Sequence, residues 1–373
     1  MKFQIEQKIL LEHLNYVIKG ISNKNLIPIL NCIKFELKKE GLYLLSTDNE
    51  IAIKTFIDKK DIKVIDTLGE IVISGKYIYE IIRKLGNTLV NVEELIDNQI
   101  LITTENSSFK LNCNKVEDFP NLDLEFIKDP IILNQKSIKT AINQTLFATS
   151  NQESRPVLTG INIKIKENKL KFTATDSYRL ARKIIEIDQK IKEDIDIIVP
   201  AKNLLELIRL LTIEEDNIEI HIFTNKIIFK FNSIVLMSRL INGSYPETDK
   251  LITDKFELNI KINLNELYNA IDRASLLTNE AEKNIITFES QDNLVKISSN
   301  IPEIGNVEEK LKIEKNVESD IKISFSSKYM MDAIKTFNSE EVELSFNGEI
   351  KPIIINYVDN DDLTQLILPI RTY

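Results

Sequence analysis

The sequence GEIVISGKYIYEIIRKL (69–85) recurs in altered form as DIDIIVPAKNLLELIRLL (194–211) and DIKISFSSKYMMDAIKTF (320–337). Each stretch begins with an alternating, strand-like run and continues with apolar residues at helical spacing. One lysine opens each helical part, and these residues, Lys76, Lys202 and Lys328, lie 126 positions apart. The recurrence predicts a structural unit of about 125 residues that is repeated three times.

Two further sets of motifs support the same period. LLSTDNEIA (44–52), FTATDSYRLA (172–181) and KISSNIPEIG (296–305) place Asp48, Asp176 and Asn300 at spacings of 128 and 124 residues. Each unit also opens with an alternating run, KFQIEQ (2–7), PIILNQ (130–135) or LNIKIN (258–263), and a helical pattern follows each run. We therefore predict three domains with the bounds 1–127, 128–252 and 253–373.

Within a unit, the patterns predict the order strand, helix, several strands, helix and further strands. Runs such as INIKIK (161–166) and KIIFKF (226–231) alternate apolar and polar residues, which indicates strands with one buried face. Helices are expected within 6–20, 75–85, 136–150, 201–211, 263–280 and 327–337. The fold class that follows is α+β, with two helices and two small antiparallel sheets in each of three repeated domains.

The composition indicates a cellular compartment and argues against some classes of protein. The chain has 373 residues, a net charge of −9 and two cysteines, Cys32 and Cys113, without a CxxC motif. We expect a reducing cytoplasm, with both thiols as ordinary core residues. Charged residues interrupt the N-terminal apolar residues and no apolar run reaches the length of a membrane span, so we expect neither a signal peptide nor a membrane partner. The negative charge also argues against a protein that coats DNA simply as a polycation.

The predicted helices are basic on balance inside an acidic chain. Their segments sum to a charge of +4, which leaves −13 for the remainder. If these helices share one surface, that surface can face phosphates while the rest of the protein repels them. The alternative is that they are ordinary solvated helix faces, and segment 263–280, with a charge of −2, favours that alternative.

Residues for catalysis are scarce. The histidines are His13 and His221, and both are expected to be packed or surface residues. The sequence has no HExxH, P-loop or GxGxxG motif and no Cys and His set for a metal, so no catalytic residue, metal or cofactor is expected. Asp48 and Asp176 could be paired catalytic carboxylates, but their equivalent places in two repeats favour a repeated structural or binding turn. A binding or scaffold role therefore leads, and an enzyme of nucleic-acid metabolism is the alternative from another class.

Five motifs are spread along the whole chain. They are EDFPNL (117–122), Arg155 with LTGI (158–161), ATDSYRLA (174–181), GSYPETDKLI (243–252) and LILPIRTY (366–373). Together they resemble the motifs of the bacterial DNA polymerase III beta subunits, the sliding clamps, in the same order and without large gaps. ATDSYRLA resembles the family signature ATD(G/S)(H/Y)RLA, and GSYPETDKLI resembles its connection from the second domain to the third. The resemblance implies a non-catalytic processivity subunit of a DNA-directed DNA polymerase.

This resemblance implies a ring of two protomers that are joined head-to-tail around duplex DNA, with the helices lining the hole. The ring would slide, because basic side chains that meet phosphates read no base sequence. The residues expected to face DNA are Lys24, Lys76, Arg83, Lys136, Lys139, Gln152, Lys202, Arg209, Lys328 and Lys335. Lys24 and Gln152 are included because family members place a basic residue and a glutamine at those positions.

The resemblance also implies how the ring closes and what binds to it. Phe109 of one protomer would pack against Leu276 and Leu277 of the other, unless all three are internal core residues. Client proteins would insert a short apolar peptide into a cleft between the second and third domains. The cleft would use Arg155, Leu158, Thr175, Ser177, Tyr178, Arg179, Leu180, Pro246, Lys250, Leu251, Ser326, Tyr329, Ile350, Pro352, Ile367, Leu368, Pro369, Ile370 and Arg371. The alternative for residues 175–180 is a plain turn at the end of a strand.

The chain departs from the commonest family pattern in three places. Ser177 and Tyr178 replace the frequent Gly-His, Lys250 stands where Arg is common, and Tyr373 adds a residue at the end. These departures could change which clients bind. The implied partners are double-stranded DNA without sequence preference, the polymerase III alpha subunit, the clamp-loader complex, and other polymerases and repair proteins. Nearer alternatives are a clamp-like paralogue that serves DNA repair or drug resistance, and a repeat scaffold that never encircles DNA.

Overall fold

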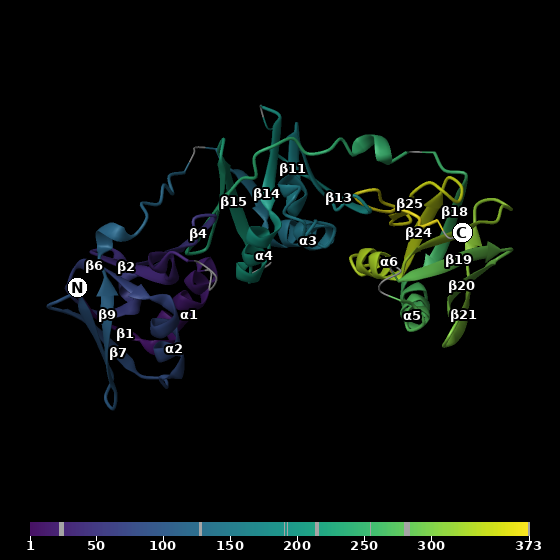
Figure 1. Ribbon diagram of the computed structural model, residues 1–373. Coiled ribbons are helices and arrows are strands. Elements are labelled where there is room, and N and C mark those ends of the chain that lie inside the picture. Colours follow the sequence, from purple (N-terminus) through teal and green to yellow (C-terminus); the bar gives the residue numbers. More distant parts are fainter. Residues whose placement is uncertain are drawn as a thin grey trace. The chain divides into compact units, whose positions relative to one another are not determined.

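The computed structural model describes residues 1–21, 26–126, 129–189, 191, 193–212, 216–253, 255–279 and 284–371. Lys24, a predicted DNA contact, and Tyr373 lie outside these residues. Internal contacts group the chain into two compact units, one of residues 1–136 and 206–240 and the other of residues 137–205 and 241–373. Each unit therefore holds the first or the third repeat together with part of the central repeat (Figure 1). The domain bounds at 127/128 and 252/253 stay predictions.

The first and central repeats have the same element order except for one further strand, β5, in the first. The first consists of β1 (Lys2–Glu6), α1 (Gln7–Val17), β2 (Cys32–Lys38), β3 (Gly41–Thr47), β4 (Ile51–Asp58), β5 (Ile62–Thr67), β6 (Gly69–Ser74), α2 (Gly75–Lys84), β7 (Leu89–Leu95), β8 (Gln99–Thr103) and β9 (Ser108–Asn114). The central repeat consists of β10 (Ile131–Asn134), α3 (Gln135–Leu146), β11 (Gly160–Lys166), β12 (Lys169–Thr175), β13 (Arg179–Glu186), β14 (Ile195–Pro200), α4 (Ala201–Leu210), β15 (Asn217–Ile222), β16 (Lys226–Phe231) and β17 (Ile234–Arg239).

The third repeat follows the same order. It consists of β18 (Leu258–Asn263), α5 (Leu264–Ser275), β19 (Ile285–Gln291), β20 (Leu294–Ile301), β21 (Gly305–Lys312), β22 (Glu314–Lys315), β23 (Lys322–Ser326), α6 (Ser327–Ile334), β24 (Glu341–Phe346), β25 (Ile353–Asn356) and β26 (Leu363–Ile367). The helices fall inside or within one residue of the six predicted segments, and α5 ends at Ser275 because the next residues form a tighter turn. The α+β prediction with two helices in each of three repeats is confirmed.

The sheets are larger than predicted because they continue from one repeat into the next. A 13-stranded sheet has the order β10-β15-β16-β17-β4-β3-β2-β6-β9-β8-β7-β1-β5, and a 9-stranded sheet has the order β14-β11-β12-β13-β26-β25-β24-β18-β22. The junctions are the antiparallel pairs β4–β17, where Ile53 faces Leu236, and β13–β26, where Ala181 faces Gln365. The physical reason is that a strand at a domain edge exposes unpaired N–H and C=O groups, which a neighbouring edge strand satisfies.

Apolar residues at helical spacing bind the helices to the sheets. In the third repeat, α5 packs against α6 and buries Leu267, Ala270, Ile271 and Ala274 in a core that also contains Phe288. Their spacing of three and four residues places them on one face of the helix. In the first repeat, α1 packs against α2 in the same way.

The turns that contain Asp48 and Asp176 have the same geometry. Asp48 Oδ1 accepts the backbone N–H groups of Glu50 and Ile51 at 2.9 Å each. Asp176 Oδ1 accepts those of Tyr178 and Arg179 at 2.9 and 3.0 Å. A carboxylate that accepts two backbone N–H groups holds the chain in a tight turn. The interpretation as a repeated turn is confirmed.

The segments that connect the repeats cover the strand junctions with apolar side chains. Leu122 and Leu124 pack on a cluster of Ala52, Ile228 and Met237 beside the β4–β17 junction. The second connection does the same at the β13–β26 junction, where the cluster is Leu180, Ile354 and Leu366 and the covering side chains are Ile252 and Phe256. Each junction is thus held by backbone hydrogen bonds and by a buried apolar cluster.

Arg179 ties the central repeat to the third at the second junction. Its Nε donates to Asp176 Oδ2 at 3.0 Å, and its Nη1 donates to Asp332 Oδ2 at 2.7 Å. The guanidinium carbon lies 4.5 Å from the ring centroid of Tyr329 and 5.2 Å from that of Phe147. A planar, delocalised cation can donate at its edge and stack on its faces at once, which a lysine cannot do.

Replacing Arg179 by Ala should lower the free energy of unfolding by about 2–3 kcal/mol, because two carboxylates lose a charged donor at a site that is only 11% exposed. Urea unfolding followed by circular dichroism measures the change. Arg83→Ala is the matched control, since it removes an exposed ion pair with Glu80 and should leave the unfolding curve unchanged. Equal destabilisation by the two variants would contradict a stabilising role for Arg179.

Both cysteines are free thiols, with Cys32 buried and Cys113 half-buried on β9. Only Cys32 therefore fits the prediction of a core residue fully. Burial raises the pKa of the Cys113 thiol to about 11, with a smaller contribution from the negative charge of Glu94.

Native Cys113 should consequently react slowly with iodoacetamide, because the thiolate is the reactive form. A pKa of about 11 in place of 9.0 lowers the thiolate fraction at pH 8 roughly 100-fold relative to the unfolded chain. Mass spectrometry of the peptide that contains Cys113 measures the rate, with the urea-unfolded protein as the control. Equal rates for the native and unfolded chains at pH 8 would show that burial does not raise this pKa.

Candidate functional site

A row of apolar side chains lies where three neighbouring strands end together. Arg179 of β13 faces Ile367 of β26, and Ile367 faces Ile353 of β25. The residues just beyond these partners are Tyr178, Leu368 and Pro352, so they follow one another along the sheet edge at about 4.8 Å per strand. The Leu368 N–H donates to the Tyr178 carbonyl at 3.0 Å, which continues the strand pairing into this row.

The row is open to solvent although it is apolar. Tyr178 is 52% exposed and Leu368 is 37% exposed, while Pro352 is half-buried. Leu251, in the short 3-10 helix Asp249–Leu251, and Ile350, in the loop before β25, are exposed by 51% and 67%. Such a concentration of exposed apolar side chains around one sheet edge is typical of a binding surface rather than of random exposure.

Tyr178 is held in a fixed position by the turn that precedes it. Ser177 has a positive φ of 78°, and Tyr178 then lies with its ring 6.5 Å from that of Tyr329, in a stacked arrangement. Burial, and next the negative charge of Asp176, raise the pKa of Tyr329. Arg179 in turn lies against the ring of Tyr329. The exposed Tyr178 therefore stacks on a ring that is itself held by Arg179.

The segment after β26 is tied down by its backbone. The Ile370 N–H donates to the Ser324 carbonyl of β23 at 2.7 Å. Pro369 and Ile370 are half-buried and Arg371 is exposed. The tail therefore forms a fixed wall beside the row of apolar residues.

Several of the predicted cleft residues lie beneath this surface rather than on it. Leu158, Thr175, Leu180, Ser326 and Ile367 are each buried. They pack in the cores that carry the exposed row, so a substitution at Leu180 would disturb the core before it altered a binding surface. Arg155, Ser177, Pro246 and Lys250 are exposed.

Three residues that support this surface were not predicted from the sequence. Asp332 and Phe147 contact Arg179, and the Tyr245 hydroxyl accepts the Thr175 N–H at 2.9 Å. Burial raises the pKa of Tyr245. Tyr245 lies inside the motif GSYPETDKLI, which was the available signal, whereas nothing in the sequence near Asp332 or Phe147 points to Arg179.

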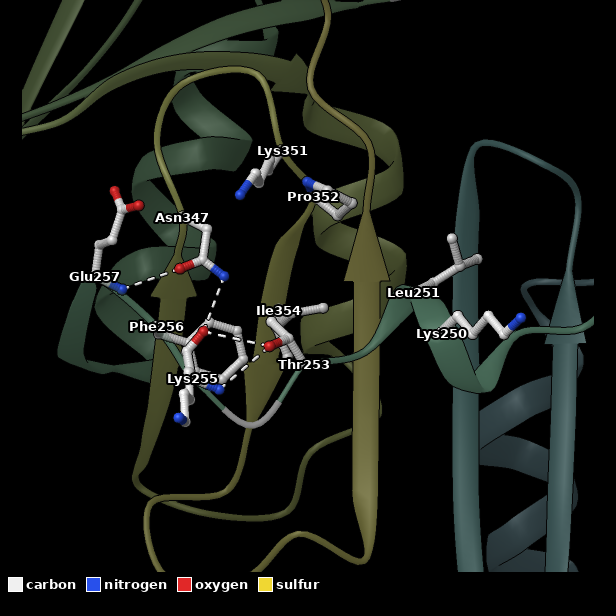
Figure 2. Close-up of a pocket in the computed structure, with 10 residues that line it drawn as sticks. All are labelled: Lys250, Leu251, Thr253, Lys255, Phe256, Glu257, Asn347, Lys351, Pro352 and Ile354. Carbon is white, nitrogen blue, oxygen red and sulfur yellow. Dashed lines mark hydrogen bonds between the residues drawn. The ribbon is translucent and has the colours of Figure 1, made fainter.

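A pocket of about 540 Å³ lies next to the row, beyond Pro352 (Figure 2). It includes Lys250 and Leu251 from the connection between the second and third repeats, and Pro352 from the predicted cleft. Its other lining residues are Thr253, Lys255, Phe256, Glu257, Asn347, Lys351 and Ile354.

The predicted DNA contacts on the second helix of each repeat occupy equivalent places. Lys76, Lys202 and Lys328 are each the second residue of α2, α4 or α6, and all three are exposed. A cation in the first turn of a helix opposes the helix dipole, so these lysines do not serve helix stability. An anion that binds there would gain from both the lysine and the helix N-terminus.

The predicted arginines on these helices carry local counter-ions. Arg83 pairs with Glu80 and Arg209 pairs with Glu206, each with an N–O distance of 2.6 Å. Both arginines are half-exposed, so phosphates could replace the glutamates as partners.

The remaining predicted contacts vary in exposure. Lys136 and Gln152 are exposed, Lys139 is half-buried, and the Lys335 ammonium lies 5.1 Å from the ring centroid of Tyr268. All of these DNA contacts stay predictions.

The predicted dimer residues are not core residues. Leu276 is 78% exposed, and Phe109 and Leu277 are half-buried. The alternative in which all three are internal core is therefore wrong, and their role between protomers stays a prediction. His13 and His221, by contrast, are buried, as expected for packed residues.

Metal-binding clusters and membrane-spanning helices are both absent from the described residues. No group of three or more His, Cys, Asp or Glu side chains in this part of the chain is placed to hold a metal ion. Among the same residues, no helix combines the length and the apolar character that a membrane span requires.

Comparison with known proteins identifies the family. Three family descriptions match in succession: DNA polymerase III beta subunit, N-terminal domain, at residues 1–123, the central domain at 132–247, and the C-terminal domain at 249–371. The chain is 40% identical to the beta sliding clamp of Staphylococcus aureus strain Mu50 and 39% identical to that of Staphylococcus epidermidis, with 100% of each chain covered.

Solved structures agree with the sequence relatives. The DNA polymerase sliding clamp of Bacillus subtilis has a TM-score of 0.96 at 35% identity, and the beta subunit from the DNA polymerase of Streptococcus pyogenes has a TM-score of 0.95 at 32% identity. Both comparisons cover 100% of both chains. The chain belongs to the DNA polymerase III beta subunit family, the bacterial sliding clamps.

Proposed function

We propose that two copies of this protein join head-to-tail into a ring that encloses duplex DNA and keeps a replicative polymerase attached to it. The protein would supply no chemistry of its own. The proposal rests on a strand junction that occurs twice within the chain. Each junction pairs a hairpin strand of one repeat with the last strand of the next repeat, and one hairpin strand and one last strand lack such a partner within the described residues.

The junctions follow a simple rule. One partner is the second strand of a hairpin, β4 or β13, and the other is the last strand of the next repeat, β17 or β26. By the same rule, β21 of the third repeat needs a last strand as its partner, and β9 of the first repeat needs a hairpin strand. Within the described residues, β21 pairs with β20 alone, and β9 pairs with β8 and, at Asn114 and Cys113 only, with β6.

A second copy of the chain can satisfy both unused edges. If β21 of one protomer pairs with β9 of the other, the same interface forms twice and the assembly closes. Phe109 lies on β9, and Leu276 and Leu277 directly follow α5, which packs against β21. Apolar side chains at these places, exposed in Leu276 and half-buried in Phe109 and Leu277, support a contact that buries them further.

Basic residues on the helices would provide the contact with DNA. Phosphates repeat along the duplex, so lysines that meet them can move from one phosphate to the next with little change in energy. Nothing in this arrangement requires a base to be read. The enclosed DNA would then be retained by the closed ring rather than by tight binding.

The apolar row at the sheet edge would hold client proteins. A short peptide with bulky apolar residues could place them on Tyr178, Leu368, Pro352 and the neighbouring Leu251. We propose the polymerase III alpha subunit, the clamp loader, and other polymerases and repair proteins as clients. We also propose a cytoplasmic location, because the reducing environment of the cytoplasm keeps thiols such as the two free ones here from forming disulfides.

The dimer contact can be tested by placing charge in it. Phe109→Asp combined with Leu276→Asp should convert the dimer to monomers in analytical ultracentrifugation, with the dissociation constant raised at least about 100-fold, because unpaired carboxylates would be buried. Ile96→Asp, at an 86% exposed position outside the proposed contact, should leave the dimer intact. A dimer that survives the double substitution would refute this interface.

Retention on DNA tests the ring. After loading by a clamp loader, the protein should stay on a nicked circular plasmid and leave soon after a restriction enzyme linearises it. Substituting Lys76, Lys202 and Lys328 by Ala should lower the salt dependence of DNA binding by up to roughly 0.9 in log–log slope per lysine that meets a phosphate. Ala at Lys39, Lys60 and Lys166, exposed lysines outside the six α-helices, is the control. Equal retention on circular and linear DNA would rule out a ring.

A further inference from the structure

We propose that the pocket beyond Pro352 is an additional compartment of the client cleft and that it takes an acidic side chain of the bound peptide. The inference rests on the proposed role of the apolar row as a peptide site. It adds a chemical preference for the residues that flank the apolar core of a client peptide.

The pocket continues the apolar row along the same sheet edge. Ser345 of β24 faces Ile354 of β25, so the next residues outward, Phe346 and Asn347, reach the level of Ile353 and Pro352. Strand ends β13, β26, β25 and β24 thus present Tyr178, Leu368, Pro352 and Asn347 in sequence. A peptide that lies along this edge and passes Pro352 enters the pocket.

The floor of the pocket is apolar and its wall is fixed. Phe256 and Ile354 belong to the cluster that covers the β13–β26 junction. Asn347 Oδ1 accepts the Glu257 N–H at 3.0 Å, and Asn347 Nδ2 donates to the Lys255 carbonyl at 3.0 Å (Figure 2). These two bonds join the connecting segment to the end of β24, so this wall of the pocket is already in place before a peptide binds.

Lysines give the pocket its charge. Lys255 and Lys351 are exposed, and in the part of the chain that the structure describes neither ammonium has a carboxylate within salt-bridge distance. The Lys351 ammonium extends into the space between Asn347 and Pro352, whereas the ammonium groups of Lys250 and Lys255 extend away from that space (Figure 2). Among the described residues that line the pocket, Glu257 is the one carboxylate.

Two lysines on other strands of the same sheet, β11 and β12, differ from these two. Lys171 pairs with Asp249 at 2.7 Å, and Lys164 pairs with Asp196 at 3.3 Å. Lys255 and Lys351 are therefore available to a carboxylate from outside the chain. An acidic side chain with an aliphatic stem, such as glutamate, would place its stem on Phe256 and its charge beside Lys351, and Lys255 would add positive charge at the rim.

Fluorescence anisotropy with labelled peptides tests the assignment in the full-length protein. All peptides share one core of Leu and Phe residues and carry three Glu, three Ser or three Lys residues on the N-terminal or the C-terminal side. We expect a Glu flank on one side to bind about 5-fold more tightly than the Ser flank at low salt, and this gain to disappear at high salt.

Lys255→Ala with Lys351→Ala should remove the gain and leave the affinity of the Ser-flanked peptide unchanged. Lys166→Ala with Lys322→Ala, at exposed positions outside the pocket, should keep the gain. Equal binding of Glu and Ser flanks, tighter binding of the Lys flank, or a gain that persists in the Lys255 and Lys351 variant would overturn the proposal. Failure of every peptide to bind would instead overturn the client cleft, and the pocket assignment with it.

Discussion

Backbone hydrogen bonds between β4 and β17 and between β13 and β26 hold successive repeats in register. Each pairing joins a sheet of one repeat to a sheet of the next, and the connecting segments bury apolar clusters over both junctions. Strand pairing is directional and specific in register, so a junction that forms twice within the chain also specifies the kind of contact that a second copy can make.

The peptide site is a consequence of the second junction. Because β13 and β26 pair side by side, Tyr178 and Leu368 meet at the sheet edge although they lie far apart in the sequence. Arg179 begins β13 and fixes Tyr329 of the third repeat behind Tyr178. The interactions that join the two repeats therefore also form the apolar surface, without any additional structural element.

The sequence predicted the repeats and their helices well because these depend on local patterns. Lys76, Lys202 and Lys328 occupy equivalent helix positions, and the turns at Asp48 and Asp176 share their hydrogen bonds. The merged sheets were not predicted, because alternation indicates a strand but does not name its partner across a domain boundary. The burial of Leu180 was not predicted for the same reason, because Phe256, which packs on the cluster that contains Leu180, comes from a distant segment.

The most direct test of the proposed pairing of β9 with β21 of a second protomer is hydrogen–deuterium exchange of their amides, measured at protein concentrations above and below the dimer dissociation constant. Those amides in Ser108–Asn114 and Gly305–Lys312 that do not bond to β8 or β20 should exchange slowly in the assembled protein and much faster when it is diluted, while β4 and β17 stay protected throughout. Exchange in β9 and β21 that is fast at every concentration, or equally slow at every concentration, would contradict pairing of these two strands between protomers.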